Sequence, residues 1–438
     1  MRTVPVVVVL SALIVAPAFG QGAAPATPMP APKPAAKSEM AGVSKSPIPT
    51  FDAGTYGRIG ETMLSYSAID VRGGWPTVPG GVELTPGAQG PAVALLRQRL
   101  AITDDLDPEK IAGDVYDDAL AAAVRKFQAR HGLAETGSVG KQTLAALNVP
   151  VKQRLKQLAA SLDRLGGRSF SFAQRYVVVN IPAAFAEAVE GDKVARRYVV
   201  VVGKPDRASP TLTTHITAVN LNPTWTVPLS IVKKDIMTKM RKDPTYVSRM
   251  HMKLLDANGA EISPSSVDWK SDRSPNFTIR QDSGNHNALG NVRIDMPNPH
   301  SVYMHDTNHR NLFSSDYRFH SSGCARVADV RDLAAWLLQD NPGWRRPEID
   351  AAIAKGGRTD VRLPRGVPVA WLYLTGWVTR DGTVHFRPDV YDHDDDQKRP
   401  LEVANQQPIA FARASGFVLQ SANAKPATFE HNAYLDNR

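Results

Sequence analysis

The chain has 438 residues, 42% of them hydrophobic and 22% charged, which is enough to bury the cores of two or three ordinary domains. This composition excludes a mostly disordered protein and a collagen-like one. Beyond the N-terminus the sequence contains no apolar run long enough for a membrane span. The net charge of +9 fits an anionic partner, either a cell-wall polymer or a nucleic acid, and the single cysteine excludes an intrachain disulfide.

The N-terminus has the pattern of a secretory signal peptide. Arg2 gives it a basic start, residues 4–18 are almost wholly apolar, and small residues precede a cleavage point after residue 20. We therefore expect residues 1–20 to be removed on export. An uncleaved membrane anchor is the alternative, but the apolar run is short for a span. Seven prolines then fall within residues 21–50, which predicts an extended, unpacked linker.

Helical periodicity follows the linker. Residues 51–80 and 150–172 are predicted to contain scaffold helices, among which 154–165 is an amphipathic stretch. Between them, residues 81–149 are predicted to form a compact unit of three helices, with Gly132 as a natural stop after the second. Nothing in this unit suggests catalysis.

Residues 173–397 have the pattern of a mainly β domain. The strand-like runs, rich in β-branched residues and bounded by turn residues, are 175–182, 198–203, 213–220, 292–294, 301–305, 367–374 and 383–386. Residues 230–284 interrupt this pattern with a basic helix and a polar loop, and a later helix is predicted at 330–338. Residues 398–438 form a polar tail, and the acidic cluster beyond Asp392 is predicted to be solvated. The fold class expected for the whole chain is α+β.

The residues that could take part in catalysis gather around the lone cysteine, Cys324. A free thiol in an exported protein risks oxidation, so a chain that keeps one often uses it. The backbone N–H groups of Gly323 and Cys324 can face an oxyanion, and Arg326 favours the thiolate and can hold a carboxylate. A nucleophilic cysteine also needs a base, because few thiols are ionised at neutral pH. The histidines near enough in sequence to supply it are His300, His305, His309 and His320.

Two other interpretations of the same residues stay open at this point. The simpler one is an inert buried cysteine that behaves as a small apolar residue. The other is a zinc site, since His305 and His309 have the spacing of a ligand pair on a helix, with Cys324 as a possible third ligand. The Asp-Thr-Asn sequence between the two histidines favours a turn instead, and the chain lacks the His-Glu-x-x-His pattern.

The sequence around these residues resembles the active-site signature of the L,D-transpeptidases. The stretches that carry the resemblance are 201–207, 222–228, 287–290, 305–307, 311–313, 321–327, 373–378 and 381–384. In that family a histidine precedes the nucleophilic cysteine by just under twenty residues, and here His305 precedes Cys324 by nineteen. Residues 81–149 resemble a three-helix peptidoglycan-binding domain, with a plain helical spacer as the alternative. The combination is similar to the larger, periplasmic branch of the family, in which a capping insertion would correspond to residues 230–284.

The resemblance also implies roles for individual residues. Cys324 would be the nucleophile, His305 the general base and acid, and the backbone N–H of Gly323 an oxyanion donor. The residues implied to bind substrate are Arg326, Ser322, Tyr303, Trp225 and Gly290. Many family members have histidine at the position of Ser322, and His320 is interpreted as structural. The family requires no metal and no other cofactor.

The implied function is an acyl transfer that builds the cell wall and maintains cell shape. A tetrapeptide stem of peptidoglycan would acylate the cysteine with release of D-alanine, and an amine of an acceptor stem would resolve the thioester into a 3–3 cross-link. The location would be the periplasm, with no transmembrane span after signal cleavage and no nucleic acid as partner. Carbapenems, which resemble the acyl donor, are expected to target the same cysteine.

Three rival functions are weighed against this transfer. One is a cysteine carboxypeptidase or endopeptidase that hydrolyses the stems, and another is a non-catalytic wall-binding protein, which retention of both Cys324 and His305 disfavours. Sortases also pair a cysteine with a histidine and an arginine, but the spacing and the flanking sequence here fit them poorly.

Overall fold

The computed structural model describes residues 44–168, 170–271 and 275–395. The predicted signal peptide and C-terminal tail lie outside these residues, and within them no helix is both long and apolar enough to cross a membrane. The helices are α1 (Thr55–Val71), α2 (Pro91–Ala101), α3 (Asp118–His131), α4 (Lys141–Leu147), α5 (Val151–Leu165), α6 (Leu229–Ile231), α7 (Met237–Lys242), α8 (Tyr246–Arg249), α9 (Val330–Leu337) and α10 (Arg346–Lys355). The strands are β1 (Arg175–Asn180), β2 (Phe185–Glu190), β3 (Lys193–Gly203), β4 (Leu212–Leu221), β5 (Trp225–Thr226), β6 (Met252–Leu255), β7 (Glu261–Ile262), β8 (Thr278–Gln281), β9 (Val292–Asp295), β10 (Met304–His305), β11 (Phe319–Ser321), β12 (Ala325–Val327), β13 (Thr359–Leu372), β14 (Gly376–Val378) and β15 (Val384–Phe386).

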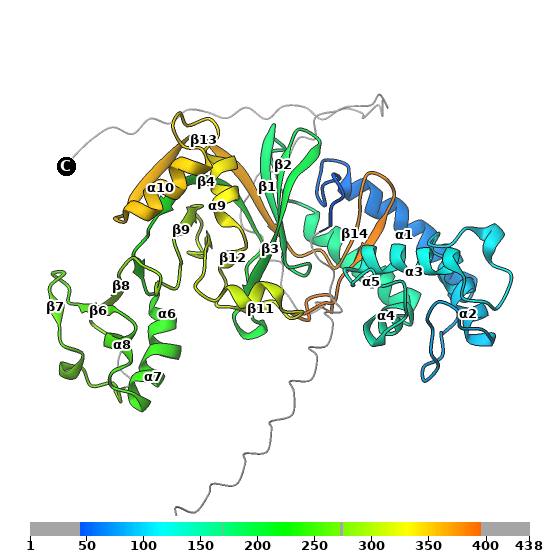
Figure 1. The fold of residues 1–438 in the computed structure, drawn as a ribbon, viewed down its shortest axis with the longest axis horizontal. Helices are drawn as coiled ribbons and strands as arrows, with labels where there is room; N and C mark the ends of the chain where they lie inside the picture. The colour runs from blue at the N-terminus through cyan, green and yellow to red at the C-terminus, as the bar shows by residue number, and fades with distance from the viewer. Residues whose placement is uncertain (1–43, 169, 272–274, 396–438) are drawn as a thin grey trace, which may run out of the picture. The chain divides into compact units, whose positions relative to one another are not determined.

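The main sheet closes on itself. Its strands are hydrogen-bonded in the order β3-β12-β10-β9-β4-β13-β1-β2, and β2 pairs again with β3. β11 adds to the far end of β3. Closure removes the free edges at which another chain could pair. The predicted α+β class, with a mainly β domain and a separate helical region, is confirmed by this arrangement (Figure 1).

Alternation along the strands separates an apolar face of this sheet from a polar one. In β9, Val292 and Ile294 belong to the main core, whereas Arg293 between them is half-buried on the other face. Successive side chains of a strand point to opposite faces, so this pattern fixes which way each one points. The apolar face packs against α9, whose Leu333 and Leu337 are fully buried in the same core. At β9 and its neighbours the polar face is therefore the one left for chemistry.

The inserted segment is a small unit with a core of its own. Its buried residues include Val232, Ile236, Met240 and Leu254, none of which belongs to the main core. The unit is not purely helical, because α6, a π-helical turn and α7 and α8 accompany a four-stranded sheet in the order β5-β8-β6-β7. The expected helix and polar loop omit these strands, since runs of two to four residues are too short to show an alternating pattern.

The helical region contains two groups of helices, each packed around a different core. α2, α3 and α4 enclose one core, which includes Leu96, Leu120 and Phe127. α1 and α5 pack on the outer face of β1 and β13 and on β14, through a second core that includes Ile59, Leu158 and Trp377. α1 and α5 thus connect the three-helix unit to the sheet.

The junction between the two regions depends on a glycine at the end of α3. Gly132 has φ +70°, and a Cβ added there would lie 2.5 Å from Nε of Arg387. Arg387 cannot move away cheaply, because it is buried and donates to the backbone carbonyls of Arg130 and Phe386 at 2.9 and 2.7 Å. We expect Gly132→Ala to lower the free energy of unfolding by about 3 kcal/mol, measured by chemical denaturation.

Gly167 offers a matched control for that substitution. Its φ is +71°, but no atom lies within 4 Å of a Cβ added there. Gly167→Ala should therefore cost only the left-handed backbone penalty of about 1 kcal/mol. Equal costs for the two variants would show that the contact with Arg387 does not matter.

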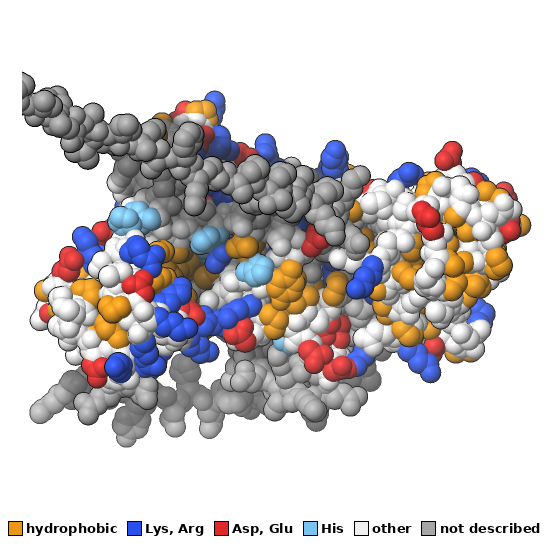
Figure 2. All heavy atoms as spheres, turned by 60° about the horizontal axis from the view of Figure 1, so that its bottom comes forward, with side chains coloured by type: hydrophobic (Ala, Val, Ile, Leu, Met, Phe, Trp, Pro, Cys, Tyr) orange, Lys and Arg blue, Asp and Glu red, His pale blue; other side chains and the backbone are white. Residues whose placement is uncertain are grey.

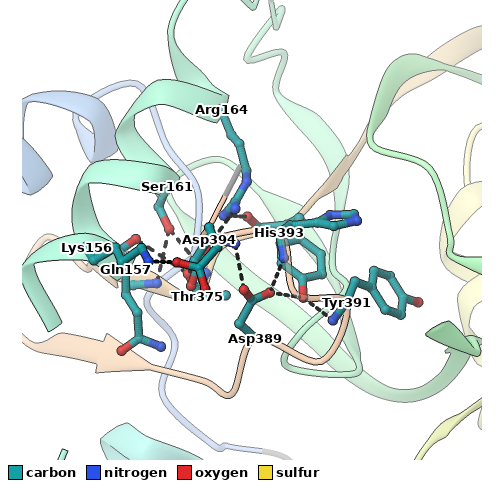
Figure 3. A network of polar contacts seen from close by, with 12 residues as sticks. Lys156, Gln157, Ser161, Arg164, Thr375, Asp389, Tyr391, His393 and Asp394 are labelled. Atoms are coloured by element: carbon teal, nitrogen blue, oxygen red, sulfur yellow. Dashed lines mark hydrogen bonds and ion pairs between the residues drawn. The ribbon is translucent and has the colours of Figure 1, made fainter. Parts of the chain in front are cut away.

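Both ends of the described chain are packed more closely than the sequence predicts. The linker was expected to be unpacked to residue 50, but Thr50 is buried and donates through its hydroxyl and its N–H to Glu187 at 2.8 and 2.9 Å. The acidic cluster beyond Asp392 was expected to be solvated, but Asp394 is buried and accepts from Arg164 and Thr375 at 2.7 and 2.9 Å (Figure 3). In both places a buried carboxylate gains hydrogen-bond donors, which offset the cost of its desolvation.

Candidate active site

Two adjacent parallel strands bring the segments of the predicted nucleophile and base side by side. β10 and β12 pair in parallel with Met304 opposite Ala325 and His305 opposite Arg326. Met304 and Ala325 are fully buried on the apolar face. Side-chain alternation therefore places His305 and Arg326 on the polar face. Cys324 directly precedes β12 in a bend, and its side chain packs against the edge of the main core.

This polar face carries a row of side chains across four strands. The register joins Asn220 of β4 to Arg293 of β9, Arg293 to His305, and His305 to Arg326. The row contains two arginines around one histidine. Positive charge on both sides disfavours a protonated imidazole.

His305 is held as a neutral base. It is buried, and its Nδ1–H donates to the backbone carbonyl of Asp306 at 2.5 Å, which leaves Nε2 as the proton acceptor. Burial and then the charge of Arg326 lower the pKa of His305 to about 3. The imidazole is thus unprotonated over the whole physiological range. The other three candidate histidines are exposed: His300, His309 and His320.

Cys324 is half-buried and rests as a thiol. Burial raises its pKa to about 11, against the opposing effects of Tyr303, Arg293 and Arg326. The site therefore needs a proton acceptor during the reaction rather than a thiolate formed beforehand.

The peptide between Gly323 and Cys324 is fixed in one orientation. The Ser209 hydroxyl donates to the carbonyl of Gly323 at 2.8 Å. Ser209 Oγ itself accepts a hydrogen bond from the N–H of Gly203 at 2.9 Å. Because a trans peptide is planar, its carbonyl and its N–H point in opposite directions. Ser209 therefore turns the Cys324 N–H away from itself, and among the described residues that N–H has no hydrogen-bond partner.

The two predicted oxyanion donors differ in this structure. The N–H of Gly323 donates to Ser321 Oγ at 3.2 Å, whereas the N–H of Cys324 is available. A donor that is already engaged must break one bond to make another. The geometry therefore favours the N–H of Cys324 over that of Gly323 for an incoming oxyanion.

Ser209→Ala should separate two kinds of thiol reaction. The variant loses the bond that orients the Cys324 N–H, so acylation, which develops an oxyanion, should slow by about ten- to a hundredfold. Alkylation by iodoacetamide develops no oxyanion and should change less than about twofold. Both rates are measured by mass spectrometry of Cys324, and Ser209→Thr, which keeps the hydroxyl, should restore acylation. Equal slowing of both reactions would contradict the orienting role.

Tyr303 and Arg326, two of the predicted substrate-binding residues, lie close to the thiol, whereas a third, Trp225, packs against the core of the insertion. Tyr303 contacts the His305 ring at 5.6 Å, and Arg293 lies 4.5 Å above the Tyr303 ring. Trp225 lies at the root of the insertion, where β5 pairs it with Gln281 of β8. Arg326 is half-buried, and among the described residues its guanidinium has no carboxylate within ion-pair distance. An unpaired cation beside a nucleophile is suited to hold an anionic group of a substrate.

The other two predicted substrate-binding residues have different surroundings. Ser322 is exposed and accepts a hydrogen bond from Arg207 at 3.0 Å. Gly290 lies against Asp306, and a Cβ added at its φ of +58° would come within 2.5 Å of the Asp306 carboxyl carbon. That carboxylate accepts from the N–H of Asn291 at 3.1 Å. Gly290 thus makes room for the residue whose carbonyl orients the histidine.

Some contacts of this site could not be predicted from the sequence. Ser209 and Arg207 reach the cysteine loop from a segment more than a hundred positions earlier. Arg293 could have been found from strand alternation, since it stands between two apolar residues of a predicted strand. Within the described ranges, no three His, Cys, Asp or Glu side chains gather as a possible set of metal ligands.

Two parts of the chain match models of known protein families. Residues 174–361 match the family model of the L,D-transpeptidase catalytic domain, and residues 89–147 match one described as "Putative peptidoglycan binding domain". A curated relative from Haemophilus influenzae, "Putative L,D-transpeptidase", is 32% identical over 219 residues, which cover 50% of this chain and 44% of that protein. The chain therefore aligns with less than half the length of that relative.

The comparison with solved structures also gives matches to L,D-transpeptidases. An L,D-transpeptidase from Xylanimonas cellulosilytica is 18% identical with a TM-score of 0.19, covering 67% of this chain and 98% of its own. One from Mycobacterium smegmatis is 16% identical with a TM-score of 0.22, covering 45% and 58%. With TM-scores this low, neither structure informs the function of this chain.

Proposed function

We propose that this chain, which carries the catalytic domain of the L,D-transpeptidase family at residues 174–361, is a peptidoglycan L,D-transpeptidase that forms 3–3 cross-links through a thioester on Cys324. The observation that carries the proposal is the pairing of β10 with β12. It supports the proposal because it sets buried His305 directly opposite Arg326, which is two residues after the single thiol of the chain and has no ion-pair partner among the described residues.

In the first half of the reaction, the thiol is acylated by a donor stem. Nε2 of His305 accepts the proton of Cys324 as the sulfur attacks the carbonyl between the third and fourth residues of a tetrapeptide. The N–H of Cys324 faces the developing oxyanion. The carbon–nitrogen bond breaks, and the departing D-alanine amine takes the proton from His305.

In the second half, an amine on the side chain of an acceptor stem attacks the thioester carbonyl. His305 accepts the amine proton and returns it to the leaving thiolate, so the thiol is restored and a new amide is formed. The energy of the cleaved amide is kept in the thioester. No nucleotide is needed, which suits an enzyme that works after export to the periplasm.

The charged surface supports an anionic wall polymer as the partner. Lys and Arg side chains gather on the insertion (Figure 2, left). The exposed basic residues along its helices are Lys233, Lys234, Lys239, Arg241, Lys242 and Arg249. Together with Arg326 beside the thiol, they are suited to the carboxylates of peptide stems. The three-helix unit would add affinity for the polymer.

Product analysis tests the proposal. The chain from residue 44 onward is incubated with a disaccharide tetrapeptide, and the products are separated by mass spectrometry. We expect dimers with one D-alanine released for each cross-link. Shortened stems without dimers would make the protein a hydrolase, and an unchanged substrate would make it a binding protein.

A further inference from the structure

The insertion is joined to the catalytic domain at its root and at a second point near the catalytic loop. At the root, Trp225 of β5 pairs with Gln281 of β8. At the second point, Asp235 in its π-helical turn pairs with Arg207 of the catalytic domain. The root contact follows from where the segment leaves the sheet. The contact at Asp235 does not, and it needs its own explanation.

Arg207 joins three parts of the molecule with one guanidinium. It follows β3 in a 3₁₀ turn, Pro205–Arg207. Its two terminal nitrogens both donate to the Asp235 carboxylate, one of them at 2.8 Å. The nitrogen that makes the shorter of these bonds also donates to Ser322 Oγ at 3.0 Å. Ser322 is only two residues before the nucleophile, so the insertion and the catalytic loop share a single planar fork.

The environment of this fork favours an ordered contact. The Arg207 side chain is only 14% exposed and that of Asp235 32%, so water screens the pair less than a fully exposed one. Asp235 also lies in a π-helical turn, a rare distortion that often occurs at functional positions. Its neighbours Lys204 and Lys239 add further positive charge around the carboxylate.

The insertion has little else in common with the core of the sheet domain. Its apolar residues form a separate cluster, as described above. A unit with its own core can move as a body about its root unless polar contacts hold it. The Arg207–Asp235 pair is such a contact, and it lies outside the root strand that contains Trp225.

We propose that Arg207 is a positioning residue that fastens the insertion across the active site and transmits its closed state to the catalytic loop through Ser322. With the contact made, the insertion limits the access of water to the thioester, so an amine acceptor is favoured over hydrolysis. With the contact broken, the thiol still reacts, but more of the thioester is lost to water. This inference rests on the proposed acyl transfer and extends it to the choice of acceptor.

The test compares four variants of the chain from residue 44 onward. Asp235→Asn and Arg207→Met remove the ion pair, Arg207→Lys keeps a charge but not the fork, and Ser322→Ala removes only the link to the loop. Asp243→Asn is the matched control, because Asp243 pairs with Arg249 inside the insertion. The readouts are the ratio of dimer to hydrolysed stem and hydrogen exchange of residues 229–242.

Breaking the ion pair should change how the thioester divides between cross-linking and hydrolysis more than it changes the reactivity of the Cys324 thiol. We expect Asp235→Asn and Arg207→Met to lower the ratio of dimer to hydrolysed stem by about five- to tenfold. Both should speed exchange in residues 229–242 and leave alkylation of Cys324 by iodoacetamide within about twofold. Arg207→Lys and Ser322→Ala should fall between these variants and the control.

Failure of this inference is distinct from failure of the proposed function. If the parent forms dimers and both ion-pair variants keep its ratio and its exchange, Arg207 is not a positioning residue. If the parent forms no dimers, the transpeptidase proposal fails. The exchange rates then decide alone, and unchanged exchange in Asp235→Asn overturns the fastening contact.

Discussion

Cys324→Ser should abolish turnover and every covalent adduct at this site. A serine hydroxyl has a far higher pKa than a thiol, and the burial that already raises the pKa of Cys324 to about 11 would also disfavour an alkoxide. His305 alone cannot offset that penalty. We expect product formation to fall below detection and the mass of the protein to stay unchanged after incubation with donor stem or imipenem.

The thiol can also be followed by its pH dependence. A pKa raised to about 11 means that the thiolate appears as pH rises, and at pH 7 about one molecule in ten thousand carries it. Alkylation of the free enzyme by iodoacetamide should therefore increase about tenfold per pH unit between pH 7 and 10. A plateau below pH 8 would instead indicate a thiolate stabilised in the resting enzyme.

The sequence predicts the nucleophile and its base because both belong to a recognisable motif with a fixed spacing. It also predicts a strand at 301–305, which includes Met304, but not the strand at Ala325–Val327. It does not predict that these strands are parallel neighbours with His305 opposite Arg326. Register depends on the closure of a sheet whose partners are distant in the chain, and no local pattern encodes it.

The supporting contacts are hidden for a similar reason. Ser209 holds the carbonyl of Gly323 across 114 positions, and Arg207 reaches Ser322 across 115. A serine or an arginine in a loop has many possible partners, and only the folded chain selects one. The family resemblance identifies the segment around Arg207, but not the pairing with Asp235, because that pairing depends on how the insertion folds on itself.

Gly290 shows how the structure can suggest a second role for a residue of a recognised motif. Gly290 was predicted to bind substrate because it lies in a stretch that resembles the family signature. In the structure it lies against the Asp306 carboxylate, and Asp306 orients the base through its backbone carbonyl. The structure therefore supports an indirect effect of Gly290 on His305. Because glycine has no side chain, Asp306 has the space to lie where its carbonyl orients the imidazole.

His305→Ala should lower the rate of acylation about a hundred- to ten-thousandfold, the usual cost of losing a general base. The resting thiol is protonated, so without Nε2 its proton must go to water in a site that excludes most of it. His309→Ala and His320→Ala are the controls, since both residues are exposed, and each should keep the rate within about threefold. Mass spectrometry of the acylated chain gives the three rates under single-turnover conditions.

The pH profile of the parent provides an independent check of the same assignment. Burial and Arg326 lower the pKa of His305 to about 3, so the base stays unprotonated as pH falls from 8 to 5. Acylation should be nearly constant over that interval, and its acid limb should lie below pH 5. His305→Ala should instead show a rate that rises with pH, because hydroxide then replaces the missing base. A dead His320→Ala with a near-normal His305→Ala would move the base to His320, and an acid limb near pH 6.5 would mean that the catalytic histidine is solvated rather than buried between Arg293 and Arg326.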